Sequence, residues 1–339
     1  MKALTTEFPT ILNFTKQFIR CQTYANEFQF LNFVSSVFGQ KLKNDSIPFS
    51  LRSKVLKEVF VEIYKDAQRV SAGEYLADSP AQLFQKDHFK SYFKILQDYR
   101  SVLKRRKNKE YRLKNGKYYP DYFNRAFHFQ TDGYTTEQSA EIYDHQVEIL
   151  FSGIASIMRK MLITSLNKNY GKIQGNVLEL ATGTGVGAKL LKDHYPAMNI
   201  TATDISREYI QFASKKHRNL KVDFKVQDAT NLEDFQDDQF DITYQIFLLH
   251  EVPKLERENI LKEQIRVSKP GGIGIIIESI QEQDRPEWKP ILDDFPKRYH
   301  EPYYKNYVQT PIVPFLEQQG AKIIDQDQIL FSKCVTFTK

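Results

Sequence analysis

The sequence predicts an α/β protein, with a doubly wound sheet covered by helices on both faces and an all-helical N-terminal domain before it. Residues 1–100 space their apolar side chains three or four positions apart, which is typical of amphipathic helices. From residue 171, short β-rich segments alternate with helical ones, and a glycine-bearing turn follows the first of them. We therefore expect a helical domain at 1–135 and a sheet domain at 171–339, joined by a helix within 136–170.

Two amphipathic segments predict the N-terminal helices. Between Phe30 and Leu42 the apolar side chains recur at helical spacing. Residues 50–67 repeat that pattern, and Ser50 stands where a helix N-cap is expected. Neither segment contains a repeat or a low-complexity tract, so we expect an ordinary packed helical domain.

A polar loop and a further helix follow. Pro120 and Asn124 punctuate the loop, and Thr135 with Gln138 matches a capping box, in which each side chain satisfies a backbone N–H at the start of a helix. The apolar residues between 140 and 161 then alternate steps of three and four. This stripe predicts one long continuous helix that leads into the second domain.

The second domain shows strands and helices in alternation, the pattern of a sheet buried on both faces. Five strands are expected at 176–180, 199–203, 221–226, 240–247 and 272–278, with helices at 186–194, 206–217 and 254–267. After a final helix near 310–319, two β-rich segments within 321–339 predict a closing hairpin, which brings the sheet to seven strands.

Composition places the chain among ordinary globular proteins, with 339 residues, of which 41% are hydrophobic and 27% charged. No apolar run approaches the roughly 18 residues that span a bilayer. The N-terminal segment interrupts its apolar residues with polar ones, unlike a signal peptide. Cys21 and Cys334 lie at opposite ends and form no disulfide or metal pattern. A cytoplasmic setting is therefore expected.

The segment "VLELATGTGVGAKLL", residues 177–191, predicts a ligand site. Gly183 and Gly185 let the backbone turn sharply and approach a ligand closely. Glu179 would oppose a diphosphate there and suits a cationic ammonium group instead. Asp204 ends the next strand, where an acid can accept both ribose hydroxyls, and Asp228 follows the third strand, beside an adenine amino group. Amine, ribose and adenine together indicate S-adenosylmethionine.

With these motifs the sequence resembles the class I S-adenosylmethionine-dependent methyltransferases. The resemblance covers about residues 165–339, with "ELATGTG", "TATDIS", "VQDAT", "FDITYQIFLLHEV" and "RVSKPGGIGIIIES" in the family's order. It is closest to the small-molecule branch that resembles the enzymes of ubiquinone and menaquinone biosynthesis. The usual first glycine of the loop is Ala181 here, a replacement that this branch also shows.

The resemblance implies a Rossmann-like seven-stranded methyltransferase sheet and S-adenosylmethionine as cofactor. Glu179 is then expected to hold the cofactor's amino group, Asp204 and Ile205 to bracket its ribose and adenine, and Gln245 to lie beside its methionyl part. The full set of cofactor-binding residues implied by position is Glu179, Ala181, Thr182, Gly183, Gly185, Asp204, Ile205, Asp228, Ala229 and Gln245.

The acceptor is expected at the carboxyl ends of the strands, where doubly wound sheets bind ligands. His250 follows the fourth strand, and an insertion at about 280–309, which the resemblance implies to be a substrate cover, contains "RYHEPYY". A histidine suits a catalytic base because its pKa is near 6.5 when unperturbed. We expect catalytic roles for His250, His300 and Tyr303, and substrate contacts from His128, Tyr143 and Tyr304. For each of these, hydrogen-bonded or aromatic packing is the open alternative.

A metal site is not expected. His128, His250 and His300 offer suitable ligand types, but no local spacing of a metal motif supports one.

Three classes of function remain open, and a small-molecule methyltransferase leads. Up to residue 135 the chain holds 23 Lys and Arg against 13 Asp and Glu, and the rest holds 25 against 29. Nine basic residues gather within 100–117, a segment typical of a solvated helix end, which an RNA- or protein-modifying methyltransferase could use to hold phosphates. A non-catalytic protein that kept the cofactor fold is the third class.

Overall fold

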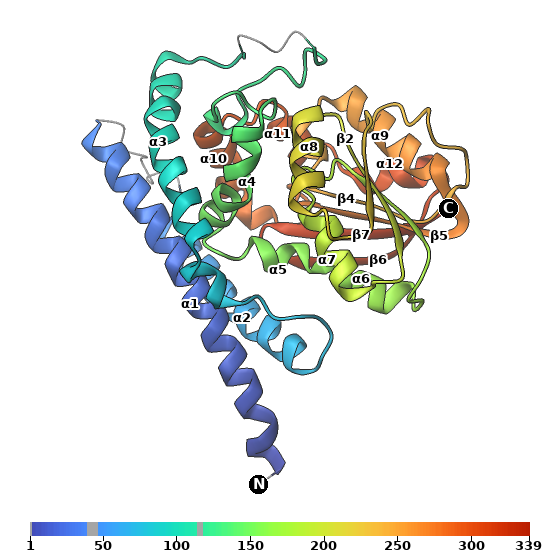
Figure 1. Cartoon of the computed structure of the whole chain (residues 1–339), viewed down its shortest axis with the longest axis horizontal. Helices are drawn as coiled ribbons and strands as arrows, with labels where there is room; N and C mark the ends of the chain where they lie inside the picture. The colour runs from blue at the N-terminus through green and yellow to red at the C-terminus, as the bar shows by residue number, and fades with distance from the viewer. Residues whose placement is uncertain (1, 39–46, 114–117) are drawn as a thin grey trace.

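The computed structural model describes residues 2–38, 47–113 and 118–339. A group of long helices from the N-terminal part stands against one end of a twisted sheet (Figure 1). Leu42 and residues 114–117 of the basic segment, on which two of the expectations bear, lie outside the described residues. The N-terminal elements are α1 (Lys2–Val37), α2 (Phe49–Ser71), a 3-10 helix (Pro80–Phe84), α3 (Lys86–Asn108) and a 3-10 helix (Phe127–Phe129).

The predicted seven-stranded sheet is confirmed. Its order is β3-β2-β1-β4-β5-β7-β6, with β1 to β5 parallel and β7 antiparallel to both of its neighbours. The strands are β1 (Asn176–Leu180), β2 (Asn199–Asp204), β3 (Val222–Val226), β4 (Phe240–Ile246), β5 (Ser268–Ser279), β6 (Lys322–Ile329) and β7 (Ser332–Thr338). The fifth strand begins earlier than expected, and the last two form the predicted hairpin.

The order of the strands creates a crevice between β1 and β4. Because parallel crossovers are right-handed, α7 (Val186–His194) and α8 (Arg207–Lys216) cover one face of the sheet, and α9 (Lys254–Val267) covers the other. The chain therefore leaves the carboxyl ends of β1 and β4 in opposite directions. Ligands of doubly wound sheets bind at such a reversal.

The long helix predicted before the sheet is wrong. The segment instead forms α4 (Glu137–Leu150), α5 (Ala155–Arg159) and α6 (Met161–Asn169), with a bend of 100° between α4 and the pair α5–α6. Ser152 and Gly153 adopt left-handed backbone angles at the break, where the chain passes α1. The N-cap also differs from the prediction, since the Thr136 hydroxyl, and not that of Thr135, accepts from the backbone N–H of Ser139.

Substitution of Gly153 tests this bend. Gly153 has φ +81°, and a Cβ there would lie 2.8 Å from Cα of Cys21 in α1. We expect Gly153→Ala to lower the free energy of unfolding by about 3 kcal/mol, because strain and overlap add. Gly171→Ala is the matched control: its φ is +65° with nothing within 4 Å, so only the strain of roughly 1 kcal/mol remains. Equal unfolding midpoints in denaturant for the two variants would contradict this account.

The segment between β5 and β6 brings a small helical layer over the sheet's edge. It contains a 3-10 helix (Pro286–Trp288), α10 (Lys289–Tyr299), α11 (Tyr304–Gln309) and α12 (Ile312–Gln318). α10 contacts the 3-10 helix Phe127–Phe129 of the N-terminal part, and α11 contacts the 3-10 helix Leu249–Glu251 that follows β4. The insertion thus meets the helical part above the end of β4.

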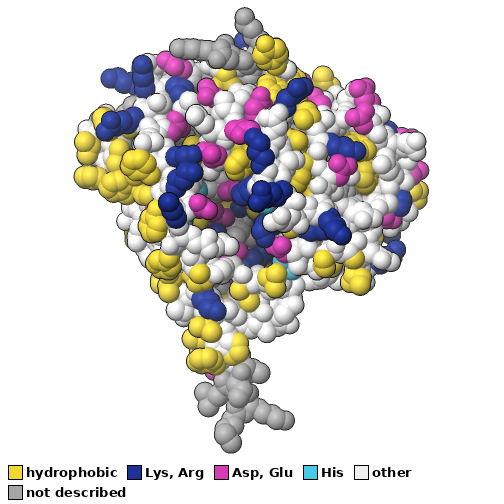
Figure 2. Space-filling view, in the orientation of Figure 1, with side chains coloured by type: hydrophobic (Ala, Val, Ile, Leu, Met, Phe, Trp, Pro, Cys, Tyr) yellow, Lys and Arg dark blue, Asp and Glu magenta, His cyan; other side chains and the backbone are white. Residues whose placement is uncertain are grey.

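Hydrophobic side chains gather on the flank of the molecule that α1 occupies (Figure 2). Phe33 and Val37 of α1 are each more than 60% exposed. Among the described residues, no single helix has the length and apolarity to cross a bilayer, and only α4 and α5–α6 together reach them, across their 100° bend.

Candidate active site

A first cavity lies at the carboxyl ends of β1, β2 and β4, and a strained turn after β1 lines it. Ala181, Gly183 and Gly185 all have positive φ, and a Cβ on Gly183 would meet nothing within 4 Å. A left-handed alanine costs roughly 1 kcal/mol or more, and such strain gathers at ligand sites. Gly187, in the first turn of α7, leaves room for the buried carboxylate of Glu179, because a Cβ there would overlap its Oε1.

Two buried carboxylates line this cavity. Oε2 of Glu179 accepts a hydrogen bond of 2.5 Å from the hydroxyl of Thr182. The oxygens of Asp204 accept from the backbone N–H groups of Gly183 and Ser206, at 2.8 Å each. Burial raises the pKa of Glu179 to about 8 and that of Asp204 to about 6, against the opposing effect of these hydrogen bonds. A ligand that carries a positive charge or donates hydrogen bonds would therefore stabilise the ionised form of both carboxyl groups.

Aromatic side chains from the N-terminal part line the same cavity. The residues Tyr122, Phe123, Phe127 and Tyr134 face it. Ser206, the N-cap residue of α8, donates a 2.7 Å hydrogen bond to the backbone carbonyl of Tyr134. None of these four aromatic residues is among the site residues predicted from the sequence. The one feature of the sequence that could have indicated them is the high density of aromatic residues between 118 and 134.

A second, apolar cavity of about 340 Å³ adjoins the first. The two share Tyr143, Val147, Phe247 and Glu251. Its other walls come from α1, α4, α10, α11 and the end of β5, and include Phe28, Leu150, Ile291, Leu292, Phe295 and Tyr304. A smaller apolar cavity between α1, α3 and α4 shares Phe28, His128 and Tyr143 with it.

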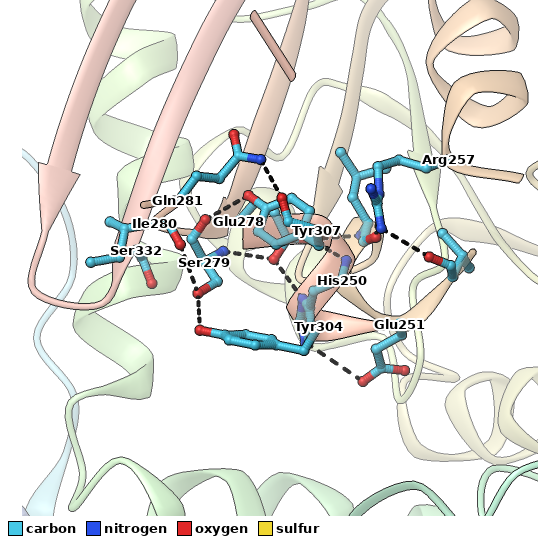
Figure 3. A network of polar contacts seen from close by, with 12 residues as sticks. His250, Glu251, Arg257, Glu278, Ser279, Ile280, Gln281, Tyr304, Tyr307 and Ser332 are labelled. Atoms are coloured by element: carbon cyan, nitrogen blue, oxygen red, sulfur yellow. Dashed lines mark hydrogen bonds and ion pairs between the residues drawn. The ribbon is translucent and has the colours of Figure 1, made fainter. Parts of the chain in front are cut away.

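A hydrogen-bonded histidine stands at the rim of β4 and β5 (Figure 3). Nδ1 of His250 lies 2.5 Å from Oε1 of Glu278, whose other oxygen accepts from the backbone N–H of Leu249 at 2.6 Å. Although burial opposes the charge, Glu278 raises the pKa of His250 to about 9, so that the imidazole is protonated at neutral pH. Tyr304 packs edge-on against this ring and exchanges a 2.7 Å hydrogen bond with Ser279.

Beyond His250, two carboxylates and a second histidine converge. Nε2 of His250 lies 4.0 Å from Oε1 of Glu251, which accepts a 2.7 Å hydrogen bond from Tyr134. His128 stands between Glu251 and Glu301, with Nε2 3.9 Å and Nδ1 3.1 Å from their Oε1 atoms. Burial raises the pKa of Glu251 to about 7, raises that of Glu301 well above its usual range, and lowers that of His128 to about 3.

The sequence around this site is similar to that of known methyltransferases. A family profile described as "Methyltransferase domain" matches residues 177–272. The demethylmenaquinone methyltransferase of Thermotoga maritima is 33% identical over 181 residues, which cover 53% of this chain and 69% of that protein. The chain belongs to the class I S-adenosylmethionine-dependent methyltransferases.

Other members of this family match a smaller part. The ubiquinone/menaquinone biosynthesis C-methyltransferase of Desulfotalea psychrophila is 33% identical over 138 residues, 37% of this chain and 55% of that protein. The chain spans about half the length of the first curated relatives that it matches. Among solved structures, the PH0226 protein of Pyrococcus horikoshii is 24% identical and covers 60% of this chain and 94% of that one, with a TM-score of 0.44.

The first cavity fits the methyltransferase cofactor, S-adenosylmethionine. Its buried acids Glu179 and Asp204 suit an ammonium group and hydroxyl donors, and the open side of Gly183 faces the same space. The structure brings most of the predicted cofactor-binding set to this cavity: Glu179, Ala181, Thr182, Gly183, Asp204, Ile205, Asp228 and Ala229. Gly185 supports the turn from behind, where a Cβ would lie 2.8 Å from the ring of His217.

Three predicted residues lie elsewhere. Gln245 is buried on the opposite side of β4 and donates a 2.7 Å hydrogen bond to Gln264, because successive side chains of a strand alternate faces. His300 ends α10 with its ring stacked on Tyr111 at 4.4 Å, and it lines none of the three cavities described above. The hydroxyl of Tyr303 donates to the backbone carbonyl of Tyr122 at 3.1 Å, also outside them.

The residues predicted to contact the acceptor, together with His250, line the second cavity. His128, Tyr143, His250 and Tyr304 all face the 340 Å³ cavity. Glu251, which is not among the site residues predicted from the sequence, lines both the first cavity and the 340 Å³ cavity.

The basic segment is partly internal. Arg105 donates to the carbonyl of Phe129 at 2.8 Å and Arg106 to that of Arg298 at 3.0 Å. These two cations connect α3 to the 3-10 helix Phe127–Phe129 and to the end of α10.

The raised pKa of Glu179 predicts a pH dependence of cofactor binding. At pH 6 this carboxyl is largely protonated, and an ammonium ligand gains only when it ionises. The affinity for S-adenosylhomocysteine should therefore rise by roughly tenfold or less between pH 6 and pH 8. Isothermal titration calorimetry at several pH values measures it. Glu179→Gln should bind more weakly and flatten the profile over this range, whereas an unchanged profile in the variant would assign the dependence to another group.

Proposed function

We propose that this methyltransferase transfers a methyl group to a small, largely apolar acceptor enclosed between the helical domain and the carboxyl ends of the strands. The observation that supports it most strongly is the shared wall of the two cavities, formed by Tyr143, Val147, Phe247 and Glu251. An acceptor in the second cavity would therefore adjoin a cofactor in the first. When bound, S-adenosylmethionine supplies an electrophilic methyl group for an in-line displacement.

The walls of the second cavity select the acceptor by shape and polarity. Phe28, Leu150, Ile291 and Phe295 offer aliphatic and aromatic contacts, and the smaller cavity extends the apolar space toward α1 and α3. Such walls favour an acceptor with an extended apolar body, which also excludes water from the reacting atoms. Relatives named demethylmenaquinone methyltransferase and fatty-acid O-methyltransferase agree with a small-molecule acceptor.

The polar groups gather at the boundary, so the reacting atom of the acceptor belongs there. Glu251 is the carboxylate that lines both cavities, and Tyr134 and His250 fix its position. His250 is protonated at neutral pH, which removes it from the role of resting base and makes it a positive neighbour of Glu251. We therefore assign the contact with the acceptor's reacting group to Glu251.

A product assay tests the proposal. The purified chain is incubated with S-adenosylmethionine and a panel of hydroxylated aromatic and long-chain acids, and mass spectrometry detects products heavier by one methylene group. Parallel reactions offer RNA and a protein extract. Methylation of small acceptors, with no salt-dependent binding of RNA, is the expected result. Methyl transfer only to RNA or protein would overturn the proposal, as would binding of S-adenosylhomocysteine without transfer to any acceptor offered.

A further inference from the structure

We propose that His128, Glu251 and Glu301 bind a divalent metal cation at the boundary of the two cavities. The three residues come from distant segments: the 3-10 helix Phe127–Phe129, the 3-10 helix Leu249–Glu251 after β4, and the second residue after α10. One ligand atom from each lies within 4.8 Å of the others. Sequence reasoning expected no metal because no single segment contains a metal motif.

The state of Glu301 is the observation that points to a ligand. Its side chain is fully buried, and neither carboxylate oxygen has a hydrogen-bond partner among the described residues. Burial of a carboxylate is strongly unfavourable unless a cation or a donor compensates it. Glu251 already has a positive neighbour, since Nε2 of His250 lies 4.0 Å from its Oε1, and it accepts a hydrogen bond from Tyr134. In the described part of the chain, no Lys or Arg forms an ion pair with Glu301, so a bound cation would chiefly compensate this carboxylate.

The separation of His128 and Glu301 suits two ligands of one metal ion. Nδ1 of His128 and Oε1 of Glu301 are 3.1 Å apart, about the separation of two ligands that meet a cation at right angles with bonds of ~2.1 Å. One imidazole nitrogen and two carboxylate oxygens are a ligand set for Mn²⁺, Fe²⁺ or Zn²⁺, with positions left for other ligands. His250, with Nδ1 held by Glu278, directs its other nitrogen toward Glu251 in the manner of the groups that orient metal ligands.

A second group of similar composition provides the contrast. In the helical part, Glu27 places one oxygen 2.8 Å from Nε2 of His88 and the other 2.8 Å from Nε2 of His145. Both of its oxygens therefore have hydrogen-bond partners. The group connects α1, α3 and α4 through these bonds and needs no metal ion. Of these two groups among the described residues, the one at Glu301 contains the buried carboxylate without a hydrogen-bond partner.

The position of the site suggests its use, and this part rests on the proposed function. Glu251 lines both cavities, so a cation there could accept an oxygen of the acceptor as a further ligand. Coordination lowers the pKa of a bound hydroxyl, so the hydroxyl would release its proton to water at neutral pH. Its oxygen would then form a bond to the methyl group as the bond from that methyl group to sulfur breaks, and S-adenosylhomocysteine would be the leaving group. The inferred acceptor class is an apolar molecule that presents a hydroxyl or a pair of adjacent oxygens.

Metal binding is measured without any acceptor. The full-length chain is freed of metal with a chelator, titrated with Mn²⁺, and followed by the electron paramagnetic resonance of free Mn²⁺. We expect about one bound Mn²⁺ per chain. Glu301→Gln and His128→Ala should each abolish that binding while keeping the affinity for S-adenosylhomocysteine, which reports the fold. Glu27→Gln, in the other group, should bind Mn²⁺ like the wild type.

The outcomes separate the site from the proposed function. Absence of Mn²⁺ binding and, in a parallel titration, of Zn²⁺ binding by the wild type would overturn the metal site, whether or not the variants fold. Equal Mn²⁺ binding by wild type and both variants, or loss of binding in Glu27→Gln alone, would overturn it too. If Mn²⁺ binds as expected but no small acceptor is methylated, the site stands and the proposed function fails.

Discussion

Replacement of Asp204 by Asn should weaken the binding of S-adenosylhomocysteine by roughly 100-fold, since hydrogen bonds to a charged group contribute about 1.5–3 kcal/mol each. The carboxylate of Asp204 accepts from the backbone N–H groups of Gly183 and Ser206. An amide has one oxygen, so its NH₂ would face one of these donors and turn the side chain away from the cavity. Calorimetric titration gives the loss directly.

The same variant should change stability little. Burial raises the pKa of Asp204 to about 6, so the ionised carboxylate opposes folding at neutral pH, and the amide removes that charge while it loses one hydrogen bond. The two effects oppose each other, and the free energy of unfolding without ligand should change by about 1 kcal/mol or less. Asp223→Asn, on the exposed strand β3, is the control and should bind normally. If Asp204→Asn binds within a few-fold of the wild type, Asp204 is not the group that holds the ribose.

Local patterns in the sequence were sufficient to predict the sheet. Each strand is a short β-rich segment with turn residues beside it, and each helix between strands carries its own period. The bend at Gly153 was not predicted, because the stripe of apolar residues continues through it. α4 and α6 bury their apolar sides against different partners, and only the turn-forming pair Ser152 and Gly153 marked the break.

The two halves of the site differ in how far the sequence reveals them. The cofactor residues stand in order after β1, β2 and β3, so a linear motif contains them. The cluster of His128, Glu251 and Glu301 combines three distant segments, which no spacing in the sequence relates. The sequence analysis selected His300, whereas the residue that joins the cluster is its neighbour Glu301. His300 ends α10 with φ +39°, so the two adjacent side chains point in different directions.

Replacement of Glu251 by Gln should lower turnover by roughly 100-fold to 10,000-fold, the range for groups that move or stabilise a proton at the reacting atom. Glu251 lines both cavities, and its amide analogue keeps the size of the side chain and can still accept from Tyr134. What the amide loses is the charge that could hold a cation or receive a proton. The affinity for S-adenosylhomocysteine should stay within roughly threefold, because the buried acids Glu179 and Asp204 are untouched.

The variant His300→Ala is the control for Glu251→Gln. His300 packs on Tyr111 outside the cavities, and its loss should lower stability more than turnover. Steady-state kinetics and S-adenosylhomocysteine titrations of both variants separate a catalytic defect from a binding defect. Normal turnover in Glu251→Gln together with a large loss in His300→Ala would restore the assignment made from the sequence. The opposite pattern locates the reacting atoms at the shared wall of the two cavities, where the buried carboxylates meet.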